Sequence, residues 1–311
     1  MKFDTPIAYI IYNRAEHTKK SFEVLKKLKP SRLFIIADGP KLGNLTDISS
    51  VTTVRKITED LNWDCRVERN YSEVNLGLKS RVSSGLDWVF EQVDKAIILE
   101  DDCIPHPDFF KFCESLLSYY ENNDKISVIT GNNFKNHRPN SSASYYFTKF
   151  CHCWGWATWK RAWKKYDGNI RFWPNWSKSE GWKKSFSDDS ELRYWKNIFD
   201  SVYLNKIDSW AYPWTACNWY NDSLSIAPNV NLVSNIGFGS DGTHTKSKNH
   251  TSANLSVFPL KNILHPHDLV QDFDADKKDY LYHFGGRNRK FPRYLVWFPL
   301  YLAKKFISKL L

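Results

Sequence analysis

Along the first 130 residues, short apolar runs alternate with segments in which apolar residues recur at helical spacing. Runs typical of buried strands occupy Ile7 to Tyr12, Leu33 to Ala37, Ala96 to Leu99 and Ile126 to Thr130, with a weaker strand pattern at Cys65 to Arg69. Between them, the spacing of apolar residues predicts helices over Glu16 to Leu28, near Thr52 to Leu61, over Leu78 to Val93 and over Asp108 to Tyr120. This alternation predicts βαβ units, and so an α/β fold with a mostly parallel central sheet flanked by helices.

The stretch from Tyr145 to Tyr220 follows a different pattern. It is dense in Trp and less regular, and we expect helices near Ala157 to Lys165 and over Ser190 to Leu204. No internal repeat or low-complexity segment interrupts the chain.

Polar residues follow three of the predicted strands. Asn13-Arg14 ends the first, Asp38 ends the second, and Glu100-Asp101-Asp102 ends the fourth. Ligands of open α/β sheets bind beyond the carboxyl ends of the strands. We therefore expect these three positions to lie along one edge and to face one ligand.

The cluster Glu100-Asp101-Asp102 carries the most specific chemistry. Three adjacent carboxylates repel one another unless a cation or hydrogen-bond donors compensate them. Such oxygen-rich sites suit Mg²⁺ or Mn²⁺, with phosphate oxygens of a ligand completing the coordination shell. A solvated acidic turn is the alternative, and the position directly after an apolar strand favours the metal site.

Composition and charge narrow the choice of partner. The chain has 311 residues, 42% of them hydrophobic, which excludes a disordered protein. The 14 Trp residues suit stacking on sugar faces or contact with a membrane interface. A net charge of +10 favours an anionic partner, although Lys and Arg that only solvate the surface remain an alternative. Six scattered cysteines and no opening secretory signal favour reduced thiols in the cytoplasm.

The run Ile98-Leu99-Glu100-Asp101-Asp102-Cys103-Ile104-Pro105-His106-Pro107-Asp108-Phe109-Phe110 resembles the metal-binding segment of the N-acetylglucosaminyltransferase I family and its bacterial relatives. That family has the GT-A fold and transfers sugars from nucleotide donors. The resemblance implies that Asp102 ligates Mn²⁺ or Mg²⁺. It also implies that Glu100 and Asp101 contact the sugar and ribose of the donor.

Weaker similarity extends over residues 6 to 245. It implies that Asn13 and Arg14 bind the nucleotide sugar, with Arg14 meeting the diphosphate, that Asp38 contacts the uracil, and that Gly155-Trp156 lines the sugar pocket. Arg81 stands where the family has a donor-binding His, and Arg suits phosphate. Asp208 resembles the catalytic base of an inverting transfer, with a helix N-cap as its structural alternative. Residues 238 to 248, with His244, resemble a loop that closes over the donor.

The resemblance implies one GT-A domain in two halves, residues 1–135 for the nucleotide sugar and 136–260 for the acceptor, followed by an extension over 261–311. Residues 287–311 mix basic with aromatic and aliphatic side chains, over a run too short to span a bilayer. An interfacial helix on an anionic membrane is expected there, with a helix docked on the domain or a subunit contact as alternatives. A lipid-linked or glycan acceptor in surface polysaccharide synthesis fits a peripheral protein on the inner face of the cytoplasmic membrane.

Three other functions remain open. A nucleotidyltransferase shares the fold and the metal carboxylates, but Asn13-Arg14-Ala15-Glu16 lacks the glycine-rich loop that such enzymes use. A nucleic-acid-binding protein suits the charge, yet strand-end carboxylates without a metal repel phosphate, so no nucleic-acid partner is expected. A non-catalytic glycan-binding protein on the same fold is the third alternative.

Overall fold

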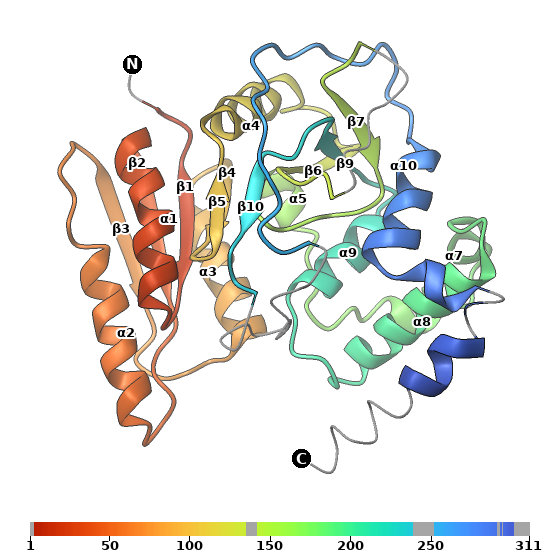
Figure 1. The fold of residues 1–311 in the computed structure, drawn as a ribbon, viewed down its shortest axis with the longest axis horizontal. Helices are drawn as coiled ribbons and strands as arrows, with labels where there is room; N and C mark the ends of the chain where they lie inside the picture. The colour runs from red at the N-terminus through yellow and green to blue at the C-terminus, as the bar shows by residue number, and fades with distance from the viewer. Residues whose placement is uncertain (1–2, 135–141, 239–251, 291–292, 294, 302–311) are drawn as a thin grey trace.

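A computed structural model describes residues 3–134, 142–238, 252–290, 293 and 295–301 (Figure 1). Its strands are β1 (Ile7–Ile11), β2 (Arg32–Ala37), β3 (Arg66–Tyr71), β4 (Lys95–Glu100), β5 (Cys103–Pro105), β6 (Ile126–Thr130), β7 (Tyr145–Thr148), β8 (Trp156–Trp159), β9 (Leu224–Pro228) and β10 (Val233–Asn235). Its α-helices are α1 (Ala15–Leu28), α2 (Leu45–Ile57), α3 (Leu78–Gln92), α4 (Pro107–Tyr119), α5 (Lys160–Trp163), α6 (Trp173–Trp176), α7 (Glu180–Lys184), α8 (Asp189–Tyr203), α9 (Ala211–Tyr220) and α10 (Phe273–Lys278). A π-helical turn, Asp279–His283, and a 3-10 turn, Gly286–Arg289, follow α10.

The central sheet has eight strands in the order β3-β2-β1-β4-β8-β6-β9-β7. Strands β3, β2, β1 and β4 are mutually parallel, and β6 and β9 run in the same direction. Only β8 and β7 run against them. The predicted fold class, α/β with a mostly parallel sheet flanked by helices, is confirmed.

Apolar side chains pack on both faces of the sheet. One face is covered by α1, α2 and α4, whose buried residues include Phe22, Val54 and Phe112. The other is covered by α3, α5 and the start of α9, with Leu86 and Trp163. Alternation along β1 explains the two layers, because Ile7 and Tyr9 face one side and Ala8 and Ile10 the other. The sheet core therefore needs both sets of crossover helices.

Five of the 14 Trp side chains form a separate aromatic cluster. Trp173, Trp176, Trp182, Trp195 and Trp219 pack together from α6, α7, α8 and α9. Trp182 lies edge-on to Trp173 at 4.8 Å between ring centroids, and Trp195 lies edge-on to Trp219 at the same distance. These rings are buried, so this part of the Trp content serves packing and not a membrane or sugar surface.

Two helix predictions need correction. The helix expected near Thr52 to Leu61 begins earlier, at Leu45, because the side chain of Asn44 caps it by accepting the N–H of Asp47 at 3.0 Å. The helix expected over Ala157 to Lys165 is wrong in its first part. Strand β8 occupies Trp156–Trp159 and pairs with β4 and β6, which leaves only Lys160–Trp163 helical. The long-range pairing overrides the local pattern there.

In the part of the chain that the structure describes, no helix has both the length and the apolarity needed to cross a membrane.

Candidate active site at the carboxyl edge of the sheet

The structure brings Arg14 and the acidic cluster together. Strands β1 and β4 are parallel neighbours, so the residues that follow them emerge side by side. The Arg14 guanidinium donates a hydrogen bond to Asp101 and lies 3.0 Å from Oδ2 of Asp102. One cation thus bridges two of the three carboxylates that the sequence places in a row.

Helix α1 holds this arrangement in place. Arg14 stands at its N-cap, and the backbone carbonyl of Arg14 accepts the N–H and the hydroxyl of Thr18, both at 2.9 Å. One turn further on, the hydroxyl of Ser21 donates to the carbonyl of Asp101 at 2.8 Å. The same Ser21 oxygen lies 2.6 Å from the buried hydroxyl of Tyr9. The acidic turn is therefore clamped to α1 by main-chain and side-chain contacts.

Arg14 compensates the acidic cluster only in part. Burial, reinforced by Asp102, raises the pKa of Glu100, and Arg14 opposes this only in part. Burial also raises the pKa of Asp101, again against the attraction of Arg14. Oδ2 of Asp101 is buried without a hydrogen-bond partner. An unused acceptor and uncompensated negative charge mark this place as one that favours a cation or a donor-rich ligand.

A distant segment completes the cluster. Strand β10 pairs antiparallel with β5, which directly follows Asp102. This pairing lets Asn235 donate to Oδ1 of Asp102 at 3.2 Å and the N–H of Ile236 donate to its carbonyl at 2.9 Å. Gly237 then passes so close that a Cβ there would lie 2.1 Å from Oδ2 of Asp102. The sequence did not link Asn235 or Gly237 to Asp102, because no local pattern joins them to a segment more than 130 residues earlier.

Asp38 lies at the same edge, after β2, and fastens a loop. Its Oδ1 accepts the N–H groups of Gly39 and Leu76, each at 2.9 Å. Its Oδ2 accepts the N–H of Gly77 at 3.1 Å and the side chain of Asn75 at 3.2 Å. These four bonds occupy both oxygens of a buried carboxylate. The predicted uracil contact therefore requires one of these donors to be replaced.

Asn13 donates to a second buried carboxylate that the sequence analysis did not single out. Its amide lies 2.6 Å from Oδ1 of Asp47, while the hydroxyl of Tyr12 and the N–H of Lys41 each lie 2.7 Å from Oδ2. Burial works against ionisation of Asp47, but these donors outweigh it and lower its pKa. Asn13 thus supports the loop after β2, beside the position predicted for the diphosphate.

Arg81 lies inside the protein, 5% exposed. It donates to the backbone carbonyl of Asn70 at 2.9 Å and to its side-chain oxygen at 2.8 Å, and its buried Nε has no partner. Burial lowers the pKa of Arg81, and the attraction of Asp38 only partly offsets this. Its described side-chain hydrogen bonds go to Asn70 in β3, and none of them joins it to Arg14 or Asp101.

Asp208 reaches the start of α3. Its Oδ1 accepts the backbone N–H of Lys79 at 3.1 Å, and its Oδ2 would lie 3.4 Å from a Cβ on Gly77. The alternative considered from the sequence, a cap on the helix that follows Asp208, is wrong: α9 begins after Trp210, which makes no side-chain cap bond. Asp208 is exposed and lies on the Asp38 side of the edge.

Gly155 forms a backbone turn and Trp156 packs in the hydrophobic core, so neither presents much surface to a ligand. Gly155 has a φ of +71°, and a Cβ there would lie 2.8 Å from the side chain of Val233 in β10. The Trp156 ring is 1% exposed and stacks on Trp210 with 5.4 Å between centroids. Trp154, two residues before Trp156, is the less buried ring of this turn and lies edge-on to Phe238 at 5.3 Å between ring centroids. A sugar contact by Trp156 therefore needs its ring to leave the core.

The loop predicted to close over the donor, including His244, falls on residues 239–251, outside the described residues apart from Phe238. Within the described ranges, no group of three or more His, Cys, Asp or Glu side chains is arranged to hold a metal ion.

Comparison with known proteins finds only weak structural similarity. No protein-family model matches the chain, and no curated protein does. Mouse xyloside xylosyltransferase 1, in its apo form, is 8% identical with a TM-score of 0.35 over 68% of this chain and 80% of its own. A 4-diphosphocytidyl-2C-methyl-D-erythritol synthase from Anaerococcus prevotii is 12% identical, with a TM-score of 0.31 over 63% and 83%. HddC from Yersinia pseudotuberculosis is 9% identical, with a TM-score of 0.31 over 50% and 77%. Such similarity identifies neither a family nor a reaction, and it does not show membership of the N-acetylglucosaminyltransferase I family.

Proposed function

We propose that the chain is a metal-dependent glycosyltransferase that moves a sugar from a nucleoside-diphosphate donor, a UDP-sugar, to a glycan or lipid-linked acceptor in surface polysaccharide biosynthesis. The observation that carries this proposal is the Arg14 bridge to Asp101 and Asp102 at the carboxyl edge of parallel strands. A guanidinium suits a diphosphate, and carboxylates suit a donor sugar because they accept its hydroxyls. The edge offers both within one hydrogen-bonded cluster.

The residues present fit a divalent ion. Three carboxylates against one guanidinium leave an excess of two negative charges when all are ionised, which one Mn²⁺ or Mg²⁺ balances. Asp102 fits as the metal ligand. Its polar side-chain neighbours are Arg14, the neutral Asn235 and Cys103. One protein carboxylate with phosphate oxygens and water is a usual donor set for Mg²⁺. The ion, when bound, stabilises the negative charge that develops on the leaving diphosphate.

The other residues of the cluster orient the donor. Arg14 binds a phosphate oxygen while it keeps its contact with Asp101, because its fork of N–H groups serves two acceptors. The carboxylate of Glu100 accepts a hydroxyl of the donor, and so does Oδ2 of Asp101, which is buried in this structure and must become accessible when the donor binds. Asn235 keeps Asp102 in one rotamer, as a hydrogen bond to a metal ligand does elsewhere.

Asp208 is the proposed base for an inverting transfer. It is exposed, so an acceptor hydroxyl can reach it, and the N–H of Lys79 fixes one of its oxygens. The second oxygen is then available to take the proton as the hydroxyl attacks the anomeric carbon.

A calorimetric titration with UDP-sugars, with and without Mn²⁺, tests this proposal. We expect binding that requires the metal, and its loss in Asp102→Asn but not in Asp124→Asn, a control at a carboxylate that is 82% exposed. Incubation with donor and acceptor should release the nucleoside diphosphate. Release of pyrophosphate from a nucleoside triphosphate and a sugar phosphate would instead identify a nucleotidyltransferase, and binding of nucleic acid that ignores Mn²⁺ would contradict both.

A further inference from the structure

Apolar side chains are exposed beside the candidate active site. Leu42 is fully exposed, Leu45 is 81% exposed and Val74 is 64% exposed. We call these three residues the rim. Leu42 lies in the loop after β2, Leu45 is the first residue of α2, and Val74 lies in the loop after β3; both strands are parallel to β1. The rim therefore lies at the carboxyl edge of the sheet, next to Asp38.

The two rim loops are held against each other. The side chain of Asn75 donates to the carbonyl of Gly39 at 2.9 Å, and a Cβ on Gly39 would lie 2.5 Å from the backbone of Val74. Two residues after Leu42, the side chain of Asn44 caps α2 by accepting the N–H of Asp47, and the Asp47 carboxylate accepts the N–H of Lys41 at 2.7 Å. The rim residues thus project from an ordered base, and burying them elsewhere in the chain would break these contacts.

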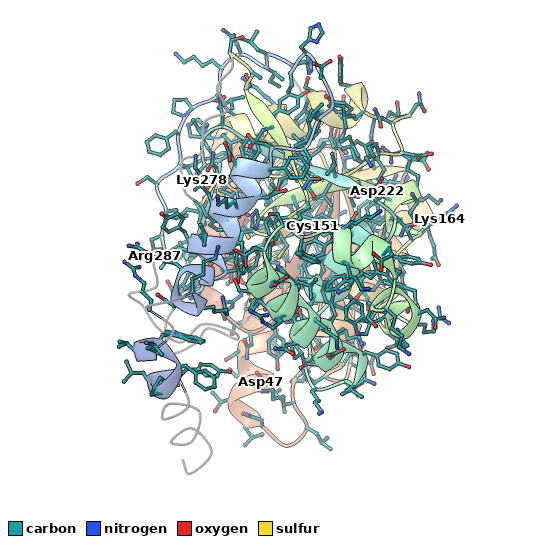
Figure 2. All side chains as sticks on the ribbon, turned by 90° about the vertical axis from the view of Figure 1, so that its right-hand side faces the viewer. Asp47, Cys151, Lys164, Asp222, Lys278 and Arg287 are labelled. Carbon is teal, nitrogen blue, oxygen red and sulfur yellow. The ribbon has the colours of Figure 1, made fainter. Side chains whose placement is uncertain are left out.

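A second exposed apolar group lies near the C-terminus. Residues 295–301 form a short helix in which Leu295, Val296, Leu300 and Tyr301 are 63%, 68%, 59% and 43% exposed. We call this segment the tail helix. These positions cover nearly two turns and so point to more than one side of the helix. Figure 2 shows the tail helix standing off the body, with side chains spread on both sides.

The base of the tail helix is fixed to the domain. The guanidinium of Arg289 lies 4.1 Å from the ring centroid of Tyr194 in α8 and 5.6 Å from that of Trp297. Lys290 forms an ion pair with Asp188, the N-cap of α8. The tail helix therefore leaves the body from a defined place. Figure 1 shows the tail helix at the lower right of the view and the loop before α2 at the lower left, so both lie toward the lower side of the molecule.

Basic side chains accompany both apolar groups. Lys41 is exposed beside Leu42, and Arg287 and Arg293 are exposed at the base of the tail helix. The whole chain carries a net charge of +10, and its sequence continues with Lys304, Lys305 and Lys309. Apolar residues flanked by Lys and Arg complement a surface that is anionic outside and apolar beneath, as a bilayer with acidic lipids is.

We propose that the rim and the tail helix dock the protein on an anionic lipid surface, with the carboxyl edge of the sheet facing the membrane. The basic side chains beside both apolar groups favour an anionic lipid surface over a second copy of this chain, which carries the same net charge of +10 and would repel it. This orientation brings Arg14 and Asp208 toward the membrane. In this orientation the acceptor is a lipid-linked saccharide at the membrane surface. This statement about the acceptor rests on the proposed function.

Co-sedimentation with phosphatidylcholine vesicles, with and without phosphatidylglycerol, tests the docking. We expect the full chain to bind the anionic vesicles only, and to bind less as salt rises. Leu42→Asp with Leu45→Asp, and separately Leu295→Asp with Leu300→Asp, should each weaken binding about tenfold or more, because each pair removes apolar contact and adds repulsion. The matched control is Leu264→Asp with Val270→Asp, exposed residues in the segment at the upper end of Figure 1, which should bind as the unchanged protein does.

Circular dichroism and calorimetric titration with the donor accompany every variant. Native spectra and unchanged donor affinity with lost vesicle binding would support docking. Equal sedimentation of all variants, or equal binding to neutral and anionic vesicles, would overturn it. So would a dimer in analytical ultracentrifugation that both pairs of substitutions dissolve, since the apolar groups would then serve self-association. Vesicle binding without donor binding would leave docking intact and reject the proposed function, so the two failures are distinguishable.

Discussion

Arg14 and Asp102 follow two different strands, and their side chains meet at 3.0 Å. The same guanidinium donates to Asp101, so it sits where a divalent ion and a diphosphate are expected to bind. Despite the burial of Arg14, the two carboxylates raise its pKa above its ordinary value, and it stays charged at every physiological pH. The edge of the sheet therefore keeps one permanent cation among three acids.

Replacing Arg14 by Lys should weaken nucleoside-diphosphate binding about tenfold or more. An ammonium keeps the charge but cannot span Asp101, Asp102 and a phosphate with a planar fork, and each charge-assisted hydrogen bond contributes about 1.5–3 kcal/mol. Calorimetric titration with UDP and Mn²⁺ measures the loss. Lys26→Arg, in the last turn of α1, is the control and should leave affinity unchanged. Unchanged binding in Arg14→Lys would show that the phosphate does not meet this guanidinium.

Gly237→Ala should disable metal and donor binding while the domain stays folded. The added Cβ would lie 2.1 Å from Oδ2 of Asp102 and 2.9 Å from Nη1 of Arg14, so either the carboxylate or the segment after β10 must move. A rise of about tenfold or more in the Mn²⁺ concentration needed for donor binding is expected, as for other changes around metal ligands. In Gly181→Ala the nearest atom is 3.6 Å away, and this control should behave normally.

Asp208→Asn should lower the turnover of sugar transfer by about 10²–10⁴-fold, with donor affinity intact. The amide oxygen of Asn still accepts the N–H of Lys79, so the start of α3 keeps its partner. Asp208→Ala removes that partner as well and should also cost about 1 kcal/mol of stability. Turnover of Asp208→Asn close to that of the unchanged enzyme would reject Asp208 as the base.

Ionisation of Asp188 should make the free energy of unfolding depend on pH in the acid range. Burial opposes its ionisation, but Lys290 and the capped groups of α8 outweigh this and lower its pKa to about 2. Because the folded pKa lies below the unfolded value, the stabilisation is complete above about pH 4 and disappears as the pH falls toward 2. Asp188→Asn keeps the cap through Oδ1 but loses the Lys290 pair. It should cost about 1–2 kcal/mol at pH 7 and almost nothing near pH 2, as measured by urea unfolding. An equal loss of stability in Asp188→Asn at pH 7 and at pH 2 would contradict a lowered pKa of Asp188.

Several features of the site were predictable from the sequence because they depend on local order. A buried strand followed by polar residues places those residues at the carboxyl edge, and this placed Arg14, Asp38 and Asp101 correctly relative to the sheet. Their partners were not predictable in the same way. That Asp38 fastens residues 75–77 depends on how two loops pack together, and this is not encoded in the spacing around either.

The sequence by itself determined the alternation of β1 to β4 with α1 to α3, and the position of the acidic residues at the end of β4. Apolar periodicity reports which face of a segment is buried, and that is a local property. Only the tertiary structure decided that Trp156–Trp159 pairs as a strand, that Asn235 and Gly237 close on Asp102, and that Asp208 meets the start of α3. These contacts join residues far apart along the chain, and their geometry is set by strand pairing and packing across the whole sheet.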